Sequence, residues 1–114
     1  MVDADTTALV GYSMGGYGAL IVAGAGLTRS FVTSAVRQSG AALRDLEAGS
    51  AMHGALVDPR IKAVVLLAPW GGGDGAWDAE GLRGLRTPAL FVVGDREQTA
   101  PYSGVRFIFF IVRW

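Results

Sequence analysis

The residues from Gly11 to Gly15 form the pattern glycine-x-serine-x-glycine, with Ser13 at its centre. A serine flanked in this way can occupy a sharp turn between a strand and a helix, where its hydroxyl is exposed and can attack a carbonyl carbon. The apolar residues 8–10 favour a strand before the turn, and Gly11, Gly15 and Gly16 are expected to give the turn its clearance. We expect Ser13 to be the nucleophile of an acyl-transfer reaction, with the N–H of Met14 donating a hydrogen bond to the developing oxyanion.

Other interpretations of this glycine-rich segment are less consistent with its details. A phosphate-binding P-loop requires lysine followed by serine or threonine, and the single lysine, Lys62, falls in an apolar segment that favours a strand. A dinucleotide-binding pattern requires a third glycine where Ile21 stands. A glycine-rich turn with an incidental serine remains the alternative, and phosphate binding is a distant second.

Composition limits the kinds of protein that this chain can be. Its 114 residues allow at most one domain, and with 51% hydrophobic and 18% charged residues it is rich in core-forming side chains. Ten basic and ten acidic residues balance without a basic block, which argues against binding to nucleic acid or to an anionic membrane. No cysteine is present, so disulfides and thiolate sites are excluded. Residues 1–5 do not resemble a signal peptide, and the longest apolar run, 107–112, is too short to span a bilayer, so we expect a cytoplasmic protein.

Three short apolar segments predict the sheet that would position Ser13. Residues 6–12, 62–68 and 89–94 are continuously apolar or nearly so, which is typical of parallel strands covered on both faces. The intervening stretches are long enough for crossover helices. We expect an α/β fold with three parallel strands in sequential order and right-handed crossovers.

Helices are expected at residues 14–25 and 37–56, the second ending before Asp58-Pro59. Residues 71–75 contain four glycines and predict a flexible loop after the second strand. The tail, residues 104–114, is compatible with either a helix or a strand, and its apolar run would promote aggregation if exposed.

Several segments, taken together, resemble one protein family. Residues 8–20 (ALVGYSMGGYGAL), preceded by 2–5 (VDAD), resemble the nucleophile region of α/β-hydrolases, and more narrowly that of bacterial dienelactone hydrolase-like enzymes. Residues 61–72 (IKAVVLLAPWGG) resemble the next strand and its Pro-Trp turn, and 87–95 (TPALFVVGD) resemble the strand that carries the acid of the catalytic triad. The resemblance implies a three-layer α/β/α fragment of this fold with a short parallel sheet.

The resemblance also implies an acid and a base. Glu97 stands at the usual position of the acid, where aspartate is commoner, and is preferred to Asp95; solvated loop charges are the alternative interpretation. The family order is serine, acid, histidine, but no histidine follows Glu97. The single histidine, His53, precedes the second strand, and we expect it to be a partly exposed helix residue and not the base.

The expected reaction is hydrolysis of a carboxylic ester or lactone through an acyl-enzyme, without a cofactor. True dienelactone hydrolases use a cysteine nucleophile, so the resemblance does not single out a lactone. Trp70 and Trp77, near the end of the second strand, are candidates for lining the substrate pocket or for covering the sheet edge. Asp74, Asp78 and Glu80 match no metal-ligand spacing, and no metal site is expected.

By this resemblance, residues 1–114 are a partial α/β-hydrolase domain that runs from the nucleophile turn to the acid loop. The family's N-terminal strands, with the second oxyanion N–H, and its C-terminal histidine segment have no counterpart here. We therefore expect weak or absent activity and self-association through exposed sheet edges. The alternative hypothesis is a non-catalytic hydrolase remnant that acts only through protein association.

Overall fold

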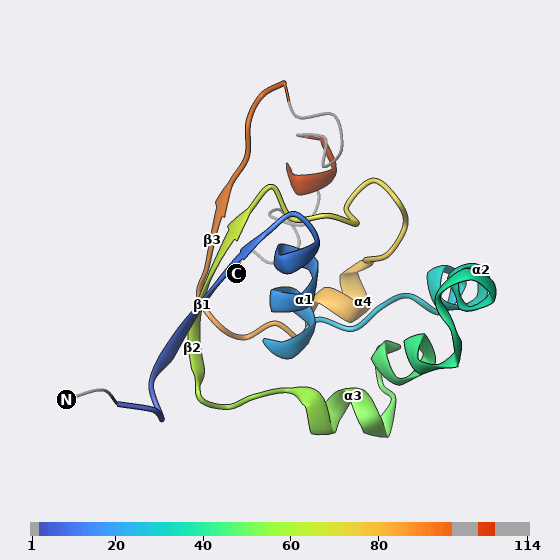
Figure 1. The fold of residues 1–114 in the computed structure, drawn as a ribbon, viewed down its shortest axis with the longest axis horizontal. Helices are drawn as coiled ribbons and strands as arrows, with labels where there is room; N and C mark the ends of the chain where they lie inside the picture. The colour runs from blue at the N-terminus through green and yellow to red at the C-terminus, as the bar shows by residue number, and fades with distance from the viewer. Residues whose placement is uncertain (1–2, 97–102, 107–114) are drawn as a thin grey trace.

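The computed structural model describes residues 3–96 and 103–106 of the chain. Figure 1 shows the elements of this part in chain order: β1 (Thr7–Tyr12), α1 (Met14–Val22), α2 (Arg29–Ser39), the 3-10 helix η1 (Ala41–Leu46), α3 (Ala51–Leu56), β2 (Ile61–Leu67), α4 (Ala79–Leu82) and β3 (Ala89–Val92). Residues 103–106 form a further helical turn. The described part is therefore an alternation of strands and helices, as expected for an α/β fold.

The three strands form one parallel sheet with the order β1-β2-β3. In the register, Val10 pairs with Val65 and Val65 with Leu90, one row of the sheet. The apolar, partly β-branched sequence of β2 suits the central position, where neighbours flank a strand on both sides. The predicted strand order is confirmed, and the strand ends differ from the prediction by at most two residues.

Helix α1 ends at Val22, three residues earlier than expected. Gly24 has a φ of 124°, and the N–H of Ala25 donates to the carbonyl of Leu20 at 2.8 Å while the N–H of Gly24 donates to that of Ile21 at 3.1 Å. This pattern is a Schellman motif, which closes a helix with a left-handed residue. Gly24 is the residue in the sequence from which this earlier helix end could have been predicted.

The prediction of one helix over residues 37–56 is wrong, because that region is divided among α2, η1 and α3. Helix α2 begins eight residues earlier, where the hydroxyl of Thr28 accepts a hydrogen bond from the N–H of Phe31 at 3.2 Å. Gly40, with a φ of 89°, ends α2, and Gly49, with a φ of 82°, separates η1 from the serine that caps α3. Two glycines with positive φ therefore interrupt the segment for which the sequence predicts one helix.

Helices cover one face of the sheet only, within the part of the chain that the structure describes. In Figure 1 the labelled helices all lie to one side of the strands, and α1 packs on β1 and β2. The core between them includes Leu20, Val64 and Leu66, each at most 1% exposed. The expected third layer is not found among these residues, and side chains alternate between buried and exposed along the strands. The prediction that both faces of the sheet are covered is therefore not confirmed within the described residues.

The segment 103–106 packs beside the glycine-rich loop that follows β2. Val105 is 2% exposed and contacts Ala68, Phe91 and Val93. A Cβ placed on Gly72 would overlap the backbone of Gly104, so the two backbones touch. The first residues of the ambiguous tail are thus helical, and residues 107–114 lie outside the described part. No helix in the described ranges is long and apolar enough to cross a membrane.

Candidate active site

Ser13 lies alone between the end of β1 and the start of α1, in a strained backbone conformation. Its φ is 52° and its ψ is −115°, one of two positive-φ conformations found at non-glycine residues in the described part. Such a conformation costs on the order of 1–3 kcal/mol and persists only where the surroundings impose it. This is the sharp strand-to-helix turn that the sequence predicts around Ser13.

Backbone hydrogen bonds from neighbouring elements hold this turn. The N–H of Ser13 donates to the carbonyl of Leu67 in β2 at 2.9 Å. The carbonyl of Ser13 accepts from the N–H of Tyr17, one turn into α1, at 3.1 Å, and from the N–H of Trp70 at 3.2 Å. The end of β2 and the residues that follow it therefore fix the conformation of the serine.

The Ser13 hydroxyl is not used to stabilise the helix that it precedes. Serine at this position commonly caps a helix by accepting a backbone N–H. Ser13 makes no such side-chain bond, and its residue is neither buried nor fully exposed. The oxygen is therefore left available, whereas Thr28 and Ser50 use theirs to cap α2 and α3.

Two of the three glycines that we expected to give clearance do so. A Cβ on Gly11 would overlap the carbonyl oxygen of Gly15, and a Cβ on Gly16 would approach Pro69 to 2.9 Å. A Cβ on Gly15 would meet nothing within 4 Å. The expectation for Gly15 is therefore wrong within the described surroundings, because the space beside it is open.

Met14 is the first residue of α1. The first N–H groups of a helix have no partner within it and lie at the positive end of the helix dipole. No acceptor for the Met14 N–H is found among the described residues. Its position is consistent with that of an oxyanion donor, and that role stays a prediction.

The acid candidates follow β3. Asp95 is exposed in a turn beyond this strand. It follows the carboxyl end of β3 as Ser13 follows that of β1, and parallel strands place their carboxyl ends at the same end of the sheet. The central strand β2 separates β3 from β1, so the two strand ends are about 10 Å apart. Glu97, the preferred candidate, lies outside the described residues, and the choice between the two stays open.

His53 is buried, so the prediction of a partly exposed residue is wrong. It is 7% exposed in α3, and its Nε2 lies 3.4 Å from the carbonyl oxygen of Ile21. Ile21 belongs to the last turns of α1, roughly 10 Å along the helix axis from Met14. His53 therefore contacts the end of α1 opposite to Ser13, which agrees with the expectation that it is not the catalytic base.

Aromatic side chains surround Tyr17, one turn after Ser13. Its ring centroid lies 5.6 Å from that of Trp70 and 5.4 Å from that of Trp77, and Phe31 lies 5.9 Å from Trp70. Burial raises the pKa of the Tyr17 hydroxyl, which disfavours its ionised form. The cluster brings together residues from α1, α2 and the segment after β2.

The two tryptophans predicted to line a pocket differ in exposure. Trp70 is partly exposed, whereas Trp77 is 3% exposed and belongs to the core. The indole N–H of Trp77 donates to the carbonyl of Trp70 at 3.4 Å, so Trp77 reaches the site only through its neighbour. Only Trp70 is thus placed to contact a ligand near the turn, and its lining role stays a prediction.

The sequence interpretation missed the strained residue that ends β2. Ala68 has a φ of 43°, and the following Pro69 is fully buried and stands against Gly16. This bend carries the chain from β2 to the Trp70 N–H that binds the Ser13 carbonyl. The Ala-Pro-Trp sequence directly after a strand was the available signal.

Among the acidic residues that follow β2, Asp78 has a structural role. Asp78 caps α4, its carboxylate accepting the N–H of Gly81 at 2.7 Å. Over residues 3–96 and 103–106, no group of three or more potential metal ligands is found. Asp78 is therefore accounted for by helix capping.

Comparison of the chain with models of protein families, with curated proteins and with solved structures finds no match. The resemblance of the sequence to α/β-hydrolases therefore stays a prediction. What the structure establishes is a mixed α/β fold with a three-stranded parallel sheet, and a strained serine between its first strand and helix.

Proposed function

We propose that Ser13 is the nucleophile of a serine hydrolase of the α/β-hydrolase type, acting on carboxylic esters or lactones. The observation that carries the proposal is the conformation of Ser13, with a φ of 52° at a strand-to-helix turn and a hydroxyl not used for capping. Strained backbone conformations that their surroundings hold in place cluster at functional sites. The sequence resemblance supports the same assignment.

The reaction follows from the position of Ser13 at the helix start. The Ser13 Oγ would attack the substrate carbonyl carbon, and the Met14 N–H would stabilise the negative charge on the carbonyl oxygen. Departure of the alcohol, which takes up a proton, would leave an acyl ester on Ser13. Attack by water would then release the carboxylic acid and restore the serine.

The proton transfers have no identified base. A histidine accepts the serine proton in this type of mechanism, and His53 lies at the far end of α1. Loss of the base lowers the rate by several orders of magnitude. We therefore expect slow acylation of Ser13, or none without help, and acceleration when imidazole in the buffer supplies a base.

The test is covalent labelling of the purified chain with a fluorophosphonate, with and without added imidazole, followed by mapping of the modified residue. We expect imidazole-dependent modification at Ser13 that is absent in Ser13→Ala. His53→Gln should label like the wild type because its ring is remote from Ser13. Ser34→Ala is the matched control, since its hydroxyl donates to a helix carbonyl.

Equal labelling of wild type and Ser13→Ala would contradict the proposal and favour the non-catalytic remnant. Turnover of p-nitrophenyl acetate gives an independent measurement. A rate that depends on Ser13 and rises with imidazole supports hydrolysis, and a rate unchanged in Ser13→Ala argues against it. Circular dichroism of each variant separates loss of chemistry from loss of folding.

A further inference from the structure

One face of the sheet is apolar, and no helix within residues 3–96 and 103–106 covers it (Figure 1). Neighbouring strands place partners in register on the same side, so two rows, Val10-Val65-Leu90 and Tyr12-Leu67-Val92, share this face with Ala8 and Ala63. We call these eight residues the open face. None of them carries a charge.

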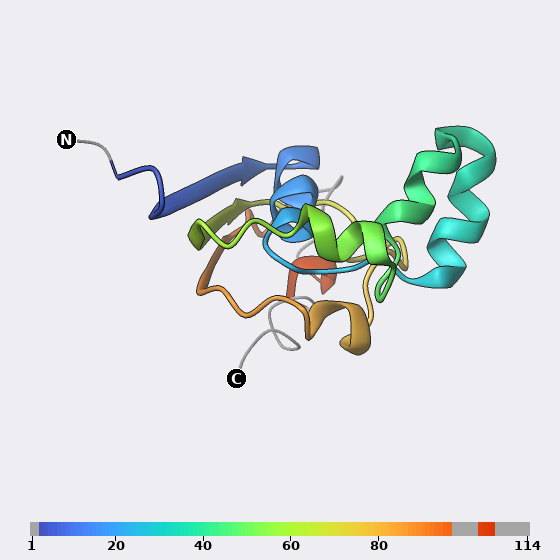
Figure 2. The same ribbon diagram turned by 90° about the horizontal axis from the view of Figure 1, so that it is seen from below.

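The exposure of these side chains is unusually high for apolar residues in a parallel sheet. Val10 is 61% exposed, Tyr12 67%, Leu90 58% and Val92 49%. The helices lie on the other face, where Leu9 and Phe91 pack against the core. In Figure 2 these helices again lie to the right of the strands.

General principles of sheet structure imply that such a face has a cover. Parallel sheets occur almost only where both faces are buried. Monomeric proteins rarely expose contiguous apolar patches larger than a few hundred Å². From the exposed fractions of these side chains and typical side-chain areas, the open face offers roughly 600 Å² of apolar surface.

We propose that the open face is a contact between two copies of this chain, packed face to face across a two-fold axis. Such an interface uses the same patch twice and so needs only one self-complementary surface. An uncharged, apolar sheet face meets this requirement, because a second sheet can pack on it at a distance of about 10 Å.

The area and chemistry of the face favour a second copy as the occupant. Two faces would bury about 1,200 Å², the lower limit of stable interfaces, so the dimer should be weak, with a dissociation constant in the micromolar range. An acidic or basic partner would gain no charge pair there, because none of the eight side chains is charged. The contact does not involve Ser13, so it can be tested independently of the proposed hydrolase activity.

The first experiment measures the mass of the chain by sedimentation velocity from about 1 to 300 µM. We expect the wild type to pass from monomer to dimer over this range. Val10→Glu and Leu90→Glu, on different strands of the open face, should remain monomeric. Met52→Glu is the matched control, because Met52 is 53% exposed on α3, away from this face, and the substitution adds the same charge.

A second measurement does not depend on the charged variants folding. The chain has no cysteine, so Leu90→Cys introduces a single thiol on the open face. Its reaction with a maleimide should slow at least about threefold at the highest protein concentration, whereas that of Met52→Cys should not. Circular dichroism checks that each variant folds.

Three results would overturn the proposal. A wild type that stays monomeric at 300 µM would mean that a second copy does not cover this face. A dimer that persists in both open-face variants would place the contact elsewhere, such as at the edge of β1. Growth beyond the dimer would show an open-ended association in place of a closed pair.

Discussion

At the scale of single residues, the turn at Ser13 depends on very short contacts between backbones. Gly11 touches the carbonyl of Gly15, and Gly16 lies against Pro69. The Ser13 carbonyl is bound by N–H groups from both α1 and the chain after β2. A serine in a left-handed conformation is thus held by its neighbours, which is the condition for such strain to persist.

The two glycines that flank Ser13 should respond in opposite ways to alanine. Gly11→Ala places a Cβ onto the carbonyl of Gly15 and should destabilise the protein by about 3 kcal/mol. Gly15→Ala meets nothing within 4 Å and replaces a helical glycine, so it should stabilise by up to about 1 kcal/mol. Urea unfolding measures both free energies. Equal destabilisation by the two substitutions would contradict the open space beside Gly15.

The sequence predicted part of this residue-level arrangement. The strand-to-helix turn at Ser13 follows from local chemistry, because glycines, a preceding strand and a following helix are all close in sequence. The burial of His53 could not be predicted, since it depends on α3 folding back against the end of α1, 32 residues earlier. Nor could the open space beside Gly15, which depends on what surrounds the turn.

At the scale of elements, helix boundaries were the weak point of the prediction. The hydrophobic pattern over residues 37–56 was compatible with a single helix, but Gly40 and Gly49 take left-handed conformations that end one helix and precede the next. Whether such a glycine ends a helix depends also on where neighbouring helices can begin. In this chain Thr28 and Ser50 cap the starts of α2 and α3. The strands were predicted closely because continuous apolar segments bounded by polar residues leave little choice.

Two threonines near the start of α2 provide a matched test of its cap. Thr28 accepts the N–H of Phe31 and donates to the carbonyl of Gly75 at 2.7 Å, so Thr28→Ala should destabilise by about 1–2 kcal/mol. Thr33 is exposed within α2 and only donates to the carbonyl of Arg29. Thr33→Ala should therefore be neutral or slightly stabilising, because alanine is the better helix former. Thermal unfolding distinguishes the two, and a neutral Thr28→Ala would contradict the assigned cap.

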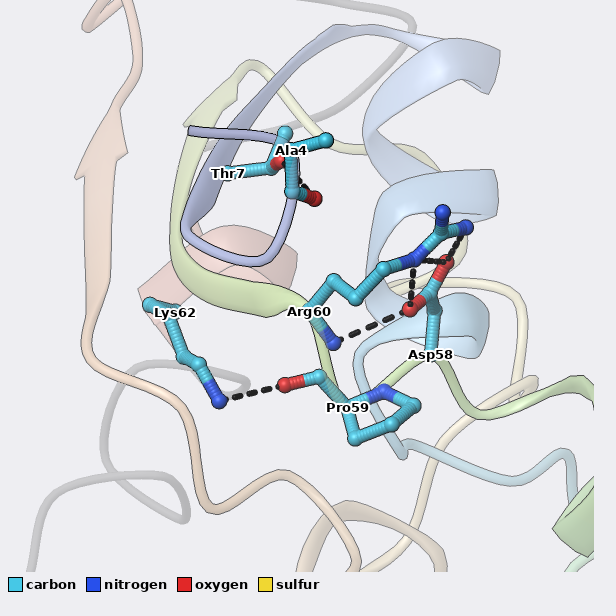
Figure 3. Close-up of polar contacts among 6 residues, drawn as sticks. All are labelled: Ala4, Thr7, Asp58, Pro59, Arg60 and Lys62. Atoms are coloured by element: carbon cyan, nitrogen blue, oxygen red, sulfur yellow. Dashed lines mark hydrogen bonds and ion pairs between the residues drawn. The ribbon is translucent and has the colours of Figure 1, made fainter. Parts of the chain in front are cut away.

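The turn into β2 carries an ion pair that makes stability depend on pH. Figure 3 shows Asp58 bound by the guanidinium of Arg60, with the shortest contact at 2.6 Å, and by the Arg60 backbone N–H. The side-chain hydrogen bond from Arg60, followed by the backbone one, lowers the pKa of Asp58 from 3.8 to about 2. Because the pKa of Asp58 is lower in the folded chain than in the unfolded chain, the ionised carboxylate stabilises the fold at pH values above the unfolded-state pKa. This stabilisation is lost as the pH falls towards 2.

We expect the free energy of unfolding to fall less between pH 5 and pH 2.5 in Asp58→Asn than in the wild type, because the variant lacks this titration. Asp74→Asn is the control, since Asp74 makes no ion pair within the described residues. Urea titrations at pH 5, 4, 3 and 2.5 measure the difference. If the wild type and Asp58→Asn show the same pH dependence, the pair with Arg60 does not contribute.

At the scale of the whole molecule, the sheet is the organising unit and its two faces differ. The sequence could not predict this difference, because the outward-facing residues of all three strands are as apolar as the inward-facing ones. Apolar residues on both faces indicate that both are covered, but the pattern does not say by what. The described helices supply one cover, and the proposed second copy of the chain supplies the other.

The final prediction concerns how stability is distributed over the molecule. Helix α2 mainly contacts η1, buries only Val32, and lies away from the strands in both ribbon views, whereas β2 is hydrogen-bonded on both sides at the centre of the sheet. Regions with few buried contacts open locally at a lower free energy than the core. We expect amides of α2 to exchange with deuterium at least about tenfold faster than those of β2, as measured by mass spectrometry or NMR. Amides of α1, which packs on the sheet, should behave like those of β2. Equal protection of α2 and β2 would instead show that residues 29–56 unfold together with the sheet as one cooperative unit.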